Sequence, residues 1–253
     1  MSTFDALAPT YDADFTQQPL GQYLRNRVHQ RLLSHYSAGD HLLEIGCGTG
    51  EDALFLAEQG LYITATDANE AMLKIAQAKT ADYPSVSVKR FDLTTLPQTS
   101  KLENGSVDGV FSNFGALNCI DDWQPLAKWL SEQMPSGAKA CFGVMSPFCA
   151  WEFIWHVGHF KWDIALRRLR GDDFGTMRIT YPTIKRLSDD FSPYFKRINV
   201  MPLGLFLPTS ALFDVVQKRP HLMKRLITLE KYFQDTSQLA LLADHYWIEF
   251  ERL

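Results

Sequence analysis

The stretch LLEIGCGTG, residues 42–50, decides how this sequence folds. Its first four residues continue a short apolar segment, its last five contain three glycines, and apolar residues at helical spacing follow over 50–59. Glycine permits positive φ and lets a ligand lie against the backbone. The free N–H groups at the start of the next helix attract a carboxylate or a phosphate. The stretch therefore predicts a strand, a ligand-binding turn and a helix.

Short apolar segments and helical segments alternate through the rest of the chain. Strands are expected at 41–45, 61–66, 86–91, 107–112, 138–145, 195–201 and 245–251, and helices at 23–36, 50–59, 69–79 and 122–133. Strands joined by helix-length crossovers form a parallel sheet with helices on both faces. The fold class expected is α/β: a doubly wound, mostly parallel seven-stranded sheet with helical lid insertions.

The chain divides into four segments by composition and pattern. These are an N-terminal arm and helix (1–39), a ligand-binding core (40–146), a lid or substrate insertion (147–194) and C-terminal strands that enclose a helical insertion (195–253). The insertion begins after Ser146-Pro147, where aromatic residues crowd one segment.

Composition excludes several classes of function. The formal charge of −4 and pI near 6.0 argue against a polyanion binder, so no nucleic-acid partner is expected. No apolar run reaches the roughly 18 residues that span a bilayer, and we expect a cytoplasmic protein without a membrane partner. The four cysteines show no CxxC pair or disulfide spacing, and His156 and His159 lack further ligands nearby, so no metal is expected.

An acid follows the second predicted strand. Asp67 stands 21 positions after Gly46, where a carboxylate accepts hydrogen bonds from ribose hydroxyls. A nicotinamide-dependent oxidoreductase uses the same logic, but its GxGxxG pattern needs glycine at position 51, and Glu51 stands there. No obvious catalytic Tyr-x-x-x-Lys is present either, which makes that alternative the less favoured one.

The pattern GxGxG preceded by Glu44 resembles motif I of the class I S-adenosylmethionine-dependent methyltransferases. The resemblance continues through DAN at 67–69, FDL at 91–93 and VDGVFSNF at 107–114, and it covers about residues 40–145. It implies a Rossmann-like methyltransferase fold with S-adenosylmethionine as the cofactor.

The resemblance also implies the roles of individual residues. It assigns the methionine part of the cofactor to Glu44, Gly46, Cys47, Gly48 and Gly50. It assigns the ribose to Asp67, the adenine to Asp92, Leu93, Ala68 and Met72, the methyl end to Asn113 and Phe114, and a covering role to Tyr11. Each has a purely structural alternative: the glycine turn for shape, Asp92 as a cap, Met72 in the core and Tyr11 packing the arm.

A small-molecule acceptor is expected. The Asn-Pro-Pro-aromatic turn of adenine and glutamine methyltransferases is replaced here by NFGA at 113–116. Because a sulfonium methyl is already activated, positioning supplies much of the catalysis. Where a general base assists, the candidates from predicted lid segments are His156, His159, Tyr181 and Asp121.

The aromatic segment 151–170 is interpreted as a lid over an aromatic or apolar acceptor. Arg167, Arg168 and Arg170 at its end suit an acidic group on that acceptor, or a solvated helix end. A homodimer contact and a membrane-surface helix are the other interpretations of the segment. At the level of function, a non-catalytic S-adenosylmethionine-binding subunit remains an alternative to the enzyme.

Overall fold

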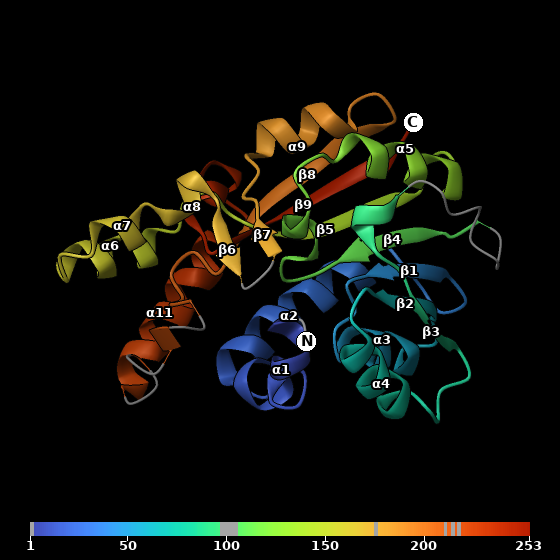
Figure 1. The fold of residues 1–253 in the computed structure, drawn as a ribbon, viewed down its shortest axis with the longest axis horizontal. Helices are drawn as coiled ribbons and strands as arrows, with labels where there is room; N and C mark the ends of the chain where they lie inside the picture. The colour runs from blue at the N-terminus through green and yellow to red at the C-terminus, as the bar shows by residue number, and fades with distance from the viewer. Residues whose placement is uncertain (1–2, 97–105, 175–176, 210–211, 214–215, 217–218) are drawn as a thin grey trace.

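The main sheet has seven strands in the order β3-β2-β1-β4-β5-β9-β8 (Figure 1). A computed structural model describes residues 3–96, 106–174, 177–209, 212–213, 216 and 219–253. The strands are β1 His41–Ile45, β2 Tyr62–Asp67, β3 Val86–Arg90, β4 Gly109–Ser112, β5 Lys139–Met145, β8 Phe195–Leu203 and β9 His245–Arg252. β1 to β5 are parallel and β9 is antiparallel to both of its neighbours, which confirms the predicted fold class.

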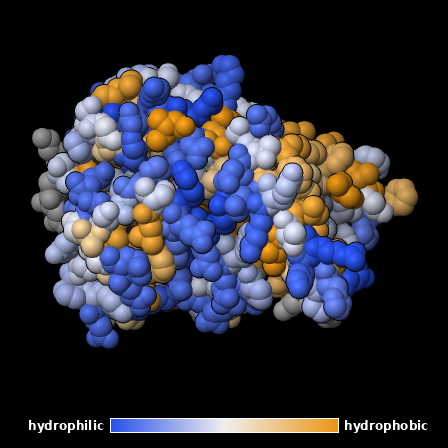
Figure 2. Space-filling view, turned by 180° about the vertical axis from the view of Figure 1, so that it is seen from behind, coloured by the Kyte–Doolittle hydropathy of each residue, from blue (hydrophilic) through white to orange (hydrophobic). Residues whose placement is uncertain are grey.

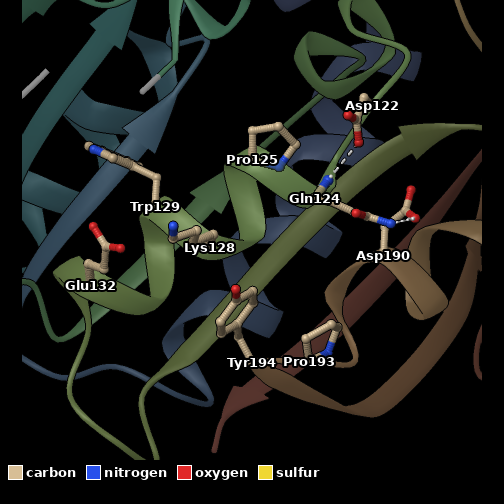
Figure 3. Close-up of a pocket in the computed structure, with 9 residues that line it drawn as sticks. All are labelled: Asp122, Gln124, Pro125, Lys128, Trp129, Glu132, Asp190, Pro193 and Tyr194. Atoms are coloured by element: carbon tan, nitrogen blue, oxygen red, sulfur yellow. Dashed lines mark hydrogen bonds between the residues drawn. The ribbon is translucent and has the colours of Figure 1, made fainter. Parts of the chain in front are cut away.

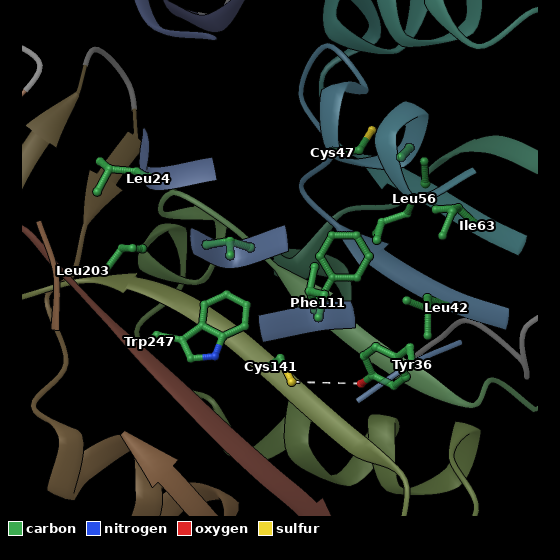
Figure 4. Close-up of a cluster of buried hydrophobic side chains, with 14 of the residues drawn as sticks. Leu24, Tyr36, Leu42, Cys47, Leu56, Ile63, Phe111, Cys141, Leu203 and Trp247 are labelled. Carbon is green, nitrogen blue, oxygen red and sulfur yellow. Dashed lines mark hydrogen bonds between the residues drawn. The ribbon is translucent and has the colours of Figure 1, made fainter. Parts of the chain in front are cut away.

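Helices α2, α3 and α4 cover one face of the sheet (Figure 1). Their bounds are Pro19–Leu33, Glu51–Glu58 and Glu70–Lys79. Leu42 and Phe111 of the sheet and Leu24 of α2 belong to the buried cluster on this side, which Figure 4 shows. The cluster fixes α2 directly beneath the sheet edge at which the glycine turn lies.

Helices α5 (Gln124–Gln133) and α9 (Ile184–Phe191) cover the opposite face (Figure 1). Leu43, the neighbour of Leu42, belongs to this second cluster with Phe142 and Phe191. Successive residues of a strand point to opposite faces, so strands buried on both sides read as continuous apolar runs.

Two insertions project from one end of the molecule (Figure 1). The first holds α6 Ala150–Gly158, α7 Trp162–Ala165, α8 Arg167–Arg170 and the hairpin β6 Asp172–Phe174 with β7 Met177–Ile179, and the second holds α11 Pro220–Phe233 and η5 Ser237–Leu242. Figure 2 shows apolar surface gathered at this end, where Phe160 and Tyr232 are more than four-fifths exposed. Among the helices in the described ranges, none is both long and apolar enough to cross a bilayer.

Most predicted elements match in place, and the differences lie outside the core. The N-terminal helix begins at Pro19 rather than at residue 23, because proline suits a first helical position. The arm before it forms α1, Thr3–Leu7, and a π-helical turn η1, Asp12–Thr16. Helix α9 and the small hairpin were not predicted.

A buried carboxylate ties α2 to β9. Glu249 is almost fully buried, and both of its oxygens accept from Arg31, at 2.8 and 2.7 Å. Trp247 donates its indole N–H to the same group, and the His35 ring lies 3.1 Å away. Burial alone raises the pKa of a carboxyl, but His35, Arg31 and Trp247 lower the pKa of Glu249 to about 2.

Glu249→Gln is expected to lower the free energy of unfolding at neutral pH by about 3 kcal/mol, the value of the depressed pKa. A depressed carboxyl pKa stabilises the fold above its ordinary value of 4.5, and this contribution is lost as the pH falls towards 2. Denaturant unfolding at several pH values measures the difference. Glu251→Gln on the same strand, which removes a partly exposed ion pair with Lys139, is the control and should change little. An equal loss for Glu249→Gln at pH 7 and pH 3 would show that shape, not charge, is responsible.

Candidate functional site

The glycine turn leaves β1 at the carboxyl edge of the parallel strands. Gly46 and Gly48 have φ of 74° and 52°, in the left-handed region that favours glycine. A Cβ at Gly46 would lie 2.3 Å from the Cβ of Ala116, so the turn packs closely on the segment after β4. By contrast, a Cβ at Gly48 would meet no described atom within 4 Å. The backbone of Gly48 therefore faces open space.

The acid after β2 lies against this turn. The Asp67 carboxylate accepts hydrogen bonds from the backbone N–H of Gly48 at 2.9 Å and of Asn69 at 2.8 Å. Burial raises the pKa of Asp67, and these two N–H groups oppose that shift. Asp67 therefore braces the turn.

The acid after β3 has a structural partner of its own. One oxygen of Asp92 accepts from the backbone N–H and the hydroxyl of Thr94, at 2.9 and 2.7 Å, and so caps the 3-10 turn η2, Leu93–Thr95. Met72 is buried in the core, while Ala68 is exposed and Leu93 half-buried. Cys47 is buried, and burial raises the pKa of its thiol far above the ordinary range.

Two buried polar groups near the turn have an atom without a hydrogen-bond partner among the described residues: Oε2 of Glu44 and Oδ1 of Asn113. Glu44 is almost fully buried at the end of β1. Its burial and the charge of Asp52 raise the pKa of Glu44 well above its ordinary value, and Arg25 opposes them. Unpartnered buried acceptors cost stability, so this corner of the site favours a ligand with hydrogen-bond donors.

The buried carboxylate of Asp52, in the first turn of α3, gathers three partners that the sequence analysis did not single out as a group. It forms an ion pair with Arg25 at 2.7 Å, lies 2.7 Å from Nε2 of His29 and accepts from Nδ2 of Asn113 at 2.8 Å. Against the effect of burial, Arg25, His29 and Asn113 hold the pKa of Asp52 well below its ordinary value. Nε of Arg25 has no partner among the described residues.

A weak signal for this network exists in the sequence. Leu20, Leu24, Val28 and Leu32 form the buried stripe of α2 at a spacing of four residues. Arg25 and His29 repeat the same spacing one position later, which places them beside that stripe.

The N-terminal arm lies over the glycine turn. Asp12 accepts from the hydroxyl of Thr49 at 2.6 Å and pairs with Lys79 at 2.8 Å, and Asp5 accepts from Asn69 at 2.8 Å. Tyr11 stands next to these contacts, and burial raises the pKa of its phenol, with Arg25 acting against it. The arm thus holds Tyr11 close to the charges of the site.

Aromatic rings surround the end of β4. Phe114, at a φ of 52°, contacts Phe15 of the arm edge-on at 5.0 Å between ring centroids, and His245 at 5.8 Å. The Arg25 guanidinium carbon lies 5.1 Å from the centre of the Phe114 ring. This cluster is the apolar side of the predicted methyl-transfer position.

The four candidate bases do not gather in one place. Asp121 is exposed, and its carbonyl accepts from Arg186 of α9. His159 is exposed at the end of α6 and contacts its neighbour Trp155, while His156 is half-buried with its pKa lowered by burial. Tyr181 is half-buried beneath the Arg168 guanidinium, at 5.5 Å. Of the four, Tyr181 makes contact with the charged network described next.

The basic end of the first insertion is already paired. Arg168 is buried and donates to Glu152 at 2.6 Å, to the Asp244 carboxylate at 2.6 Å and to the carbonyls of Ser146 and Asp244. Arg167 pairs with Glu152 and with Asp172. Arg168 therefore anchors the insertion to the sheet edge and is not free for an acidic acceptor, whereas Arg170 is exposed.

A groove of about 520 Å³ opens elsewhere, on the outer side of α5 (Figure 3). It is lined by Asp122, Gln124, Pro125, Lys128, Trp129, Glu132, Asp190, Pro193 and Tyr194. None of these residues belongs to the predicted cofactor set, and charges of both signs line the groove. In the part of the chain that the structure describes, no group of three or more His, Cys, Asp or Glu side chains is arranged to hold a metal.

Comparison with known proteins agrees with this geometry. A family model described as "Methyltransferase domain" matches residues 42–134. The fold is similar to that of the S-adenosylmethionine dependent methyltransferase from Mesorhizobium loti, with a TM-score of 0.60 and 18% identity over 90% of this chain and 98% of that one. Residues 42–134 of this chain form a methyltransferase domain, and the chain has the fold of S-adenosylmethionine-dependent methyltransferases. The family, fold and cofactor that the sequence predicts are thereby confirmed.

Two further relatives extend the methyltransferase comparison. A demethylmenaquinone methyltransferase of Clavibacter sepedonicus is 28% identical over 134 residues, 53% of each chain. The N-methyltransferase NodS of Bradyrhizobium japonicum WM9, in complex with S-adenosyl-L-homocysteine, has the same fold with a TM-score of 0.56 and 13% identity, over 93% of this chain and 89% of that one. The chain spans about half the length of the curated relatives it matches. The roles of the individual site residues stay predictions.

Asp67→Ala is expected to weaken S-adenosylmethionine binding by about 1 to 3 kcal/mol, because ligand hydroxyls and the Gly48 N–H lose their acceptor. Titration calorimetry measures the change. Asp82→Ala, at an exposed turn of the same domain, is the control. Unchanged affinity in a folded Asp67→Ala protein would remove this carboxylate from the cofactor site.

Proposed function

We propose that this protein is an S-adenosylmethionine-dependent methyltransferase that transfers the methyl group to a small, apolar aromatic acceptor. The observation that carries the proposal is a set of buried polar atoms without a hydrogen-bond partner among the described residues, namely Oε2 of Glu44, Oδ1 of Asn113 and Nε of Arg25. An acid and a guanidinium suit the two ends of a zwitterionic amino acid. S-adenosylmethionine carries such an end.

The methionine end fits these groups one by one. Burial raises the pKa of Glu44 and so favours its uncharged form. A nearby ammonium group lowers that pKa again and favours the ionised carboxylate. Arg25 brings a buried guanidinium whose Nε is unused among the described residues, and it suits the carboxylate. Because Asp52 already holds Arg25 in place, little side-chain order has to be gained on binding.

The nucleoside would lie along the next two strand ends. Asp67 keeps acceptor capacity for ribose hydroxyls beyond its two backbone contacts, since an ionised carboxylate offers about four lone-pair sites. Asp92 uses one oxygen as a cap, and its second oxygen remains for the adenine amino group. Leu93 would meet the adenine edge, and Ala68 and Met72 would flank the ring.

When bound, the cofactor supplies an electrophilic methyl group, and the protein has to place a nucleophile in line with it. Phe114, Phe15 and Trp151 offer an apolar surface beside that position, and Trp151 donates its indole N–H to the carbonyl of Phe206 at 2.6 Å. A closed apolar pocket excludes water from the reacting atoms. An acceptor with an aromatic ring fits such a lining.

One named relative supports an aromatic acceptor. The Clavibacter relative acts, by its name, on demethylmenaquinone, a quinone whose reduced form is an aromatic ring with hydroxyl groups. We therefore propose a phenol or hydroquinone as the acceptor class. A cytoplasmic location without membrane or nucleic-acid partners remains our expectation from the sequence.

The direct test has two parts. Purified protein should bind S-adenosylmethionine in calorimetry, and should release labelled methyl into an organic extract when it is incubated with 1,4-naphthoquinol. Cofactor binding without methyl release to this or other phenols would favour the non-catalytic subunit. Retention of a nicotinamide instead would favour the oxidoreductase.

Gly48→Ala tests whether the open side of the turn is the cofactor space. A side chain at positive φ costs on the order of 1 kcal/mol of stability, whatever its surroundings. Gly137→Ala is a matched control, because it also has positive φ and open surroundings but lies far from the turn in sequence. Both variants should lose similar stability in denaturant unfolding, and Gly48→Ala alone should lose cofactor affinity by at least tenfold. Equal affinity in the two variants would show that nothing occupies this space.

Trp151→Ala tests the lid. The first insertion turns Trp151 towards the core cluster and leaves Trp162 more than half exposed. We expect Trp151→Ala to lower kcat/KM for the acceptor about tenfold or more, with cofactor affinity nearly unchanged. Trp162→Ala should leave both values unchanged, and Trp162→Ala would change the oligomeric state if the segment were a dimer contact. Lost cofactor binding in Trp151→Ala would place this part of the lid over the nucleoside.

A further inference from the structure

A histidine outside the four candidate bases stands at the acceptor side of the site. His245 is the first residue of β9 and pairs with Met145, the last residue of β5. Since β9 is antiparallel, its first residue lies at the same sheet edge as the carboxyl ends of the parallel strands. His245 is buried, with 7% of its surface exposed.

A chain of neighbouring residues connects this histidine to the glycine turn. Ala116 meets the position of a Cβ on Gly46, and Gly115 packs against the side chain of Met145, the partner of His245. The imidazole also meets the Phe114 ring edge-on, with 5.8 Å between centroids and 83° between planes. His245 therefore contacts Phe114, one of the two residues that we place at the methyl end of the cofactor.

The preceding residue gives the imidazole a charged partner. Nδ1 of His245 lies 3.3 Å from Oδ2 of Asp244, whose other oxygen accepts from Arg168 at 2.6 Å. Burial raises the pKa of Asp244, but His245 and Arg168 lower it well below its ordinary value, so this carboxylate is ionised. The backbone N–H of Asp244 donates to the carbonyl of Gly204, which fixes the carboxylate relative to β8.

Charged groups from three parts of the chain lie near the His245 imidazole or the Phe114 ring beside it. Asp244 precedes β9, Arg168 of α8 faces Asp244, and Arg25 of α2 lies on the Phe114 ring that His245 also contacts. Nδ1 lies at ion-pair distance from Asp244 but makes no hydrogen bond within the described residues. The nearby negative charge still favours the tautomer with its proton on Nδ1 and a lone pair on Nε2. No hydrogen bond of Nε2 occurs within the described part of the chain.

We propose that His245 accepts the hydroxyl proton of the acceptor, with Asp244 as its positioning residue and Arg168 holding Asp244. This rests on the proposed function, in which the acceptor carries an ionisable hydroxyl group. The O–H bond breaks and its proton moves to Nε2, while the electron pair left on the acceptor forms the bond to the methyl carbon. The bond from that carbon to sulfur breaks, and its electron pair stays on sulfur. After methylation on oxygen, the proton passes from Nε2 to water. After methylation on a ring carbon, that carbon loses its proton to water and the proton on Nε2 returns to the oxygen, so that one proton is released in either case.

The other histidines that lie against a carboxylate have different surroundings. His29 uses Nε2 for Asp52, on the cofactor side of the site. His35 faces Glu249, which joins α2 to the middle of β9. Among these histidines, His245 alone contacts Phe114 through an aromatic ring pair in the described structure.

The test separates proton transfer from methyl transfer. Protein loaded with S-adenosylhomocysteine, which has no methyl group to give, is mixed with 4-nitrophenol at a pH where the free phenol is mostly protonated. The ionised form absorbs visible light, so the spectrum reports whether the bound phenol has lost its proton. We expect phenolate absorption in the wild type and in His221→Gln, an exposed histidine of α11, and its loss in His245→Gln.

Kinetics supply the second readout. With 1,4-naphthoquinol as acceptor, His245→Gln should lower kcat by about 10²- to 10⁴-fold with the cofactor Kd unchanged, the range for loss of a general base. Thermal unfolding establishes that His245→Gln is folded, and Asp244→Asn, which keeps one acceptor oxygen, should lower kcat less than His245→Gln.

Three results would overturn the proposal. They are equal phenolate absorption in wild type and His245→Gln, absence of phenolate in the wild type, or unchanged kcat in the folded variant. If the wild type methylates no phenol but still ionises bound 4-nitrophenol through His245, the proposed function fails while the proton-accepting role stands.

Discussion

The buried ion pair between Asp52 and Arg25 is the constraint on which the site depends. Asp52 belongs to α3, Arg25 to α2, and Asn113, which donates to the same carboxylate, follows β4. One carboxylate thus fixes the helix after the glycine turn, the helix beneath the sheet and the strand end at the methyl position. Breaking a buried pair leaves an uncompensated charge, which costs more than the pair gains, so the three elements hold a single arrangement.

Local pattern sufficed to predict the core from the sequence, because strands buried on both faces and glycines at positive φ leave strong local signals. His41–Ile45 and the turn after it follow from the sequence alone. The strand-end acids are also visible, since they stand at fixed distances from the turn. The structure adds that Asp67 and Asp92 serve the backbone too, through Gly48 and Thr94.

The missing parts depend on contacts between residues far apart in the chain. Arg25 and Asp52 are 27 positions apart, and no local rule pairs them. Arg168 and Asp244 are separated by 76 positions, and their pairing requires both insertions to fold against one sheet edge. In the sequence Arg168 belongs to a basic cluster that suits an acidic ligand. In the structure its guanidinium is buried, and because an unpaired buried charge is costly it pairs with carboxylates of the protein itself.

The two halves of the site are therefore held by separate networks that meet at Phe114. Asp52 and Arg25 order the side proposed for the cofactor, whereas Arg168 and Asp244 order the side proposed for the acceptor, and the Phe114 ring contacts both Arg25 and His245. Because the networks share no ionic group, the acceptor side can be rebuilt without disturbing the glycine turn. The match of the family model to residues 42–134 fits this division, since that range contains the turn and strand ends but neither insertion. Under the proposed function, acceptor choice depends on segments whose positions are set by the buried charges of Arg168 and Asp244, and a change at either residue is expected to alter the acceptor side first.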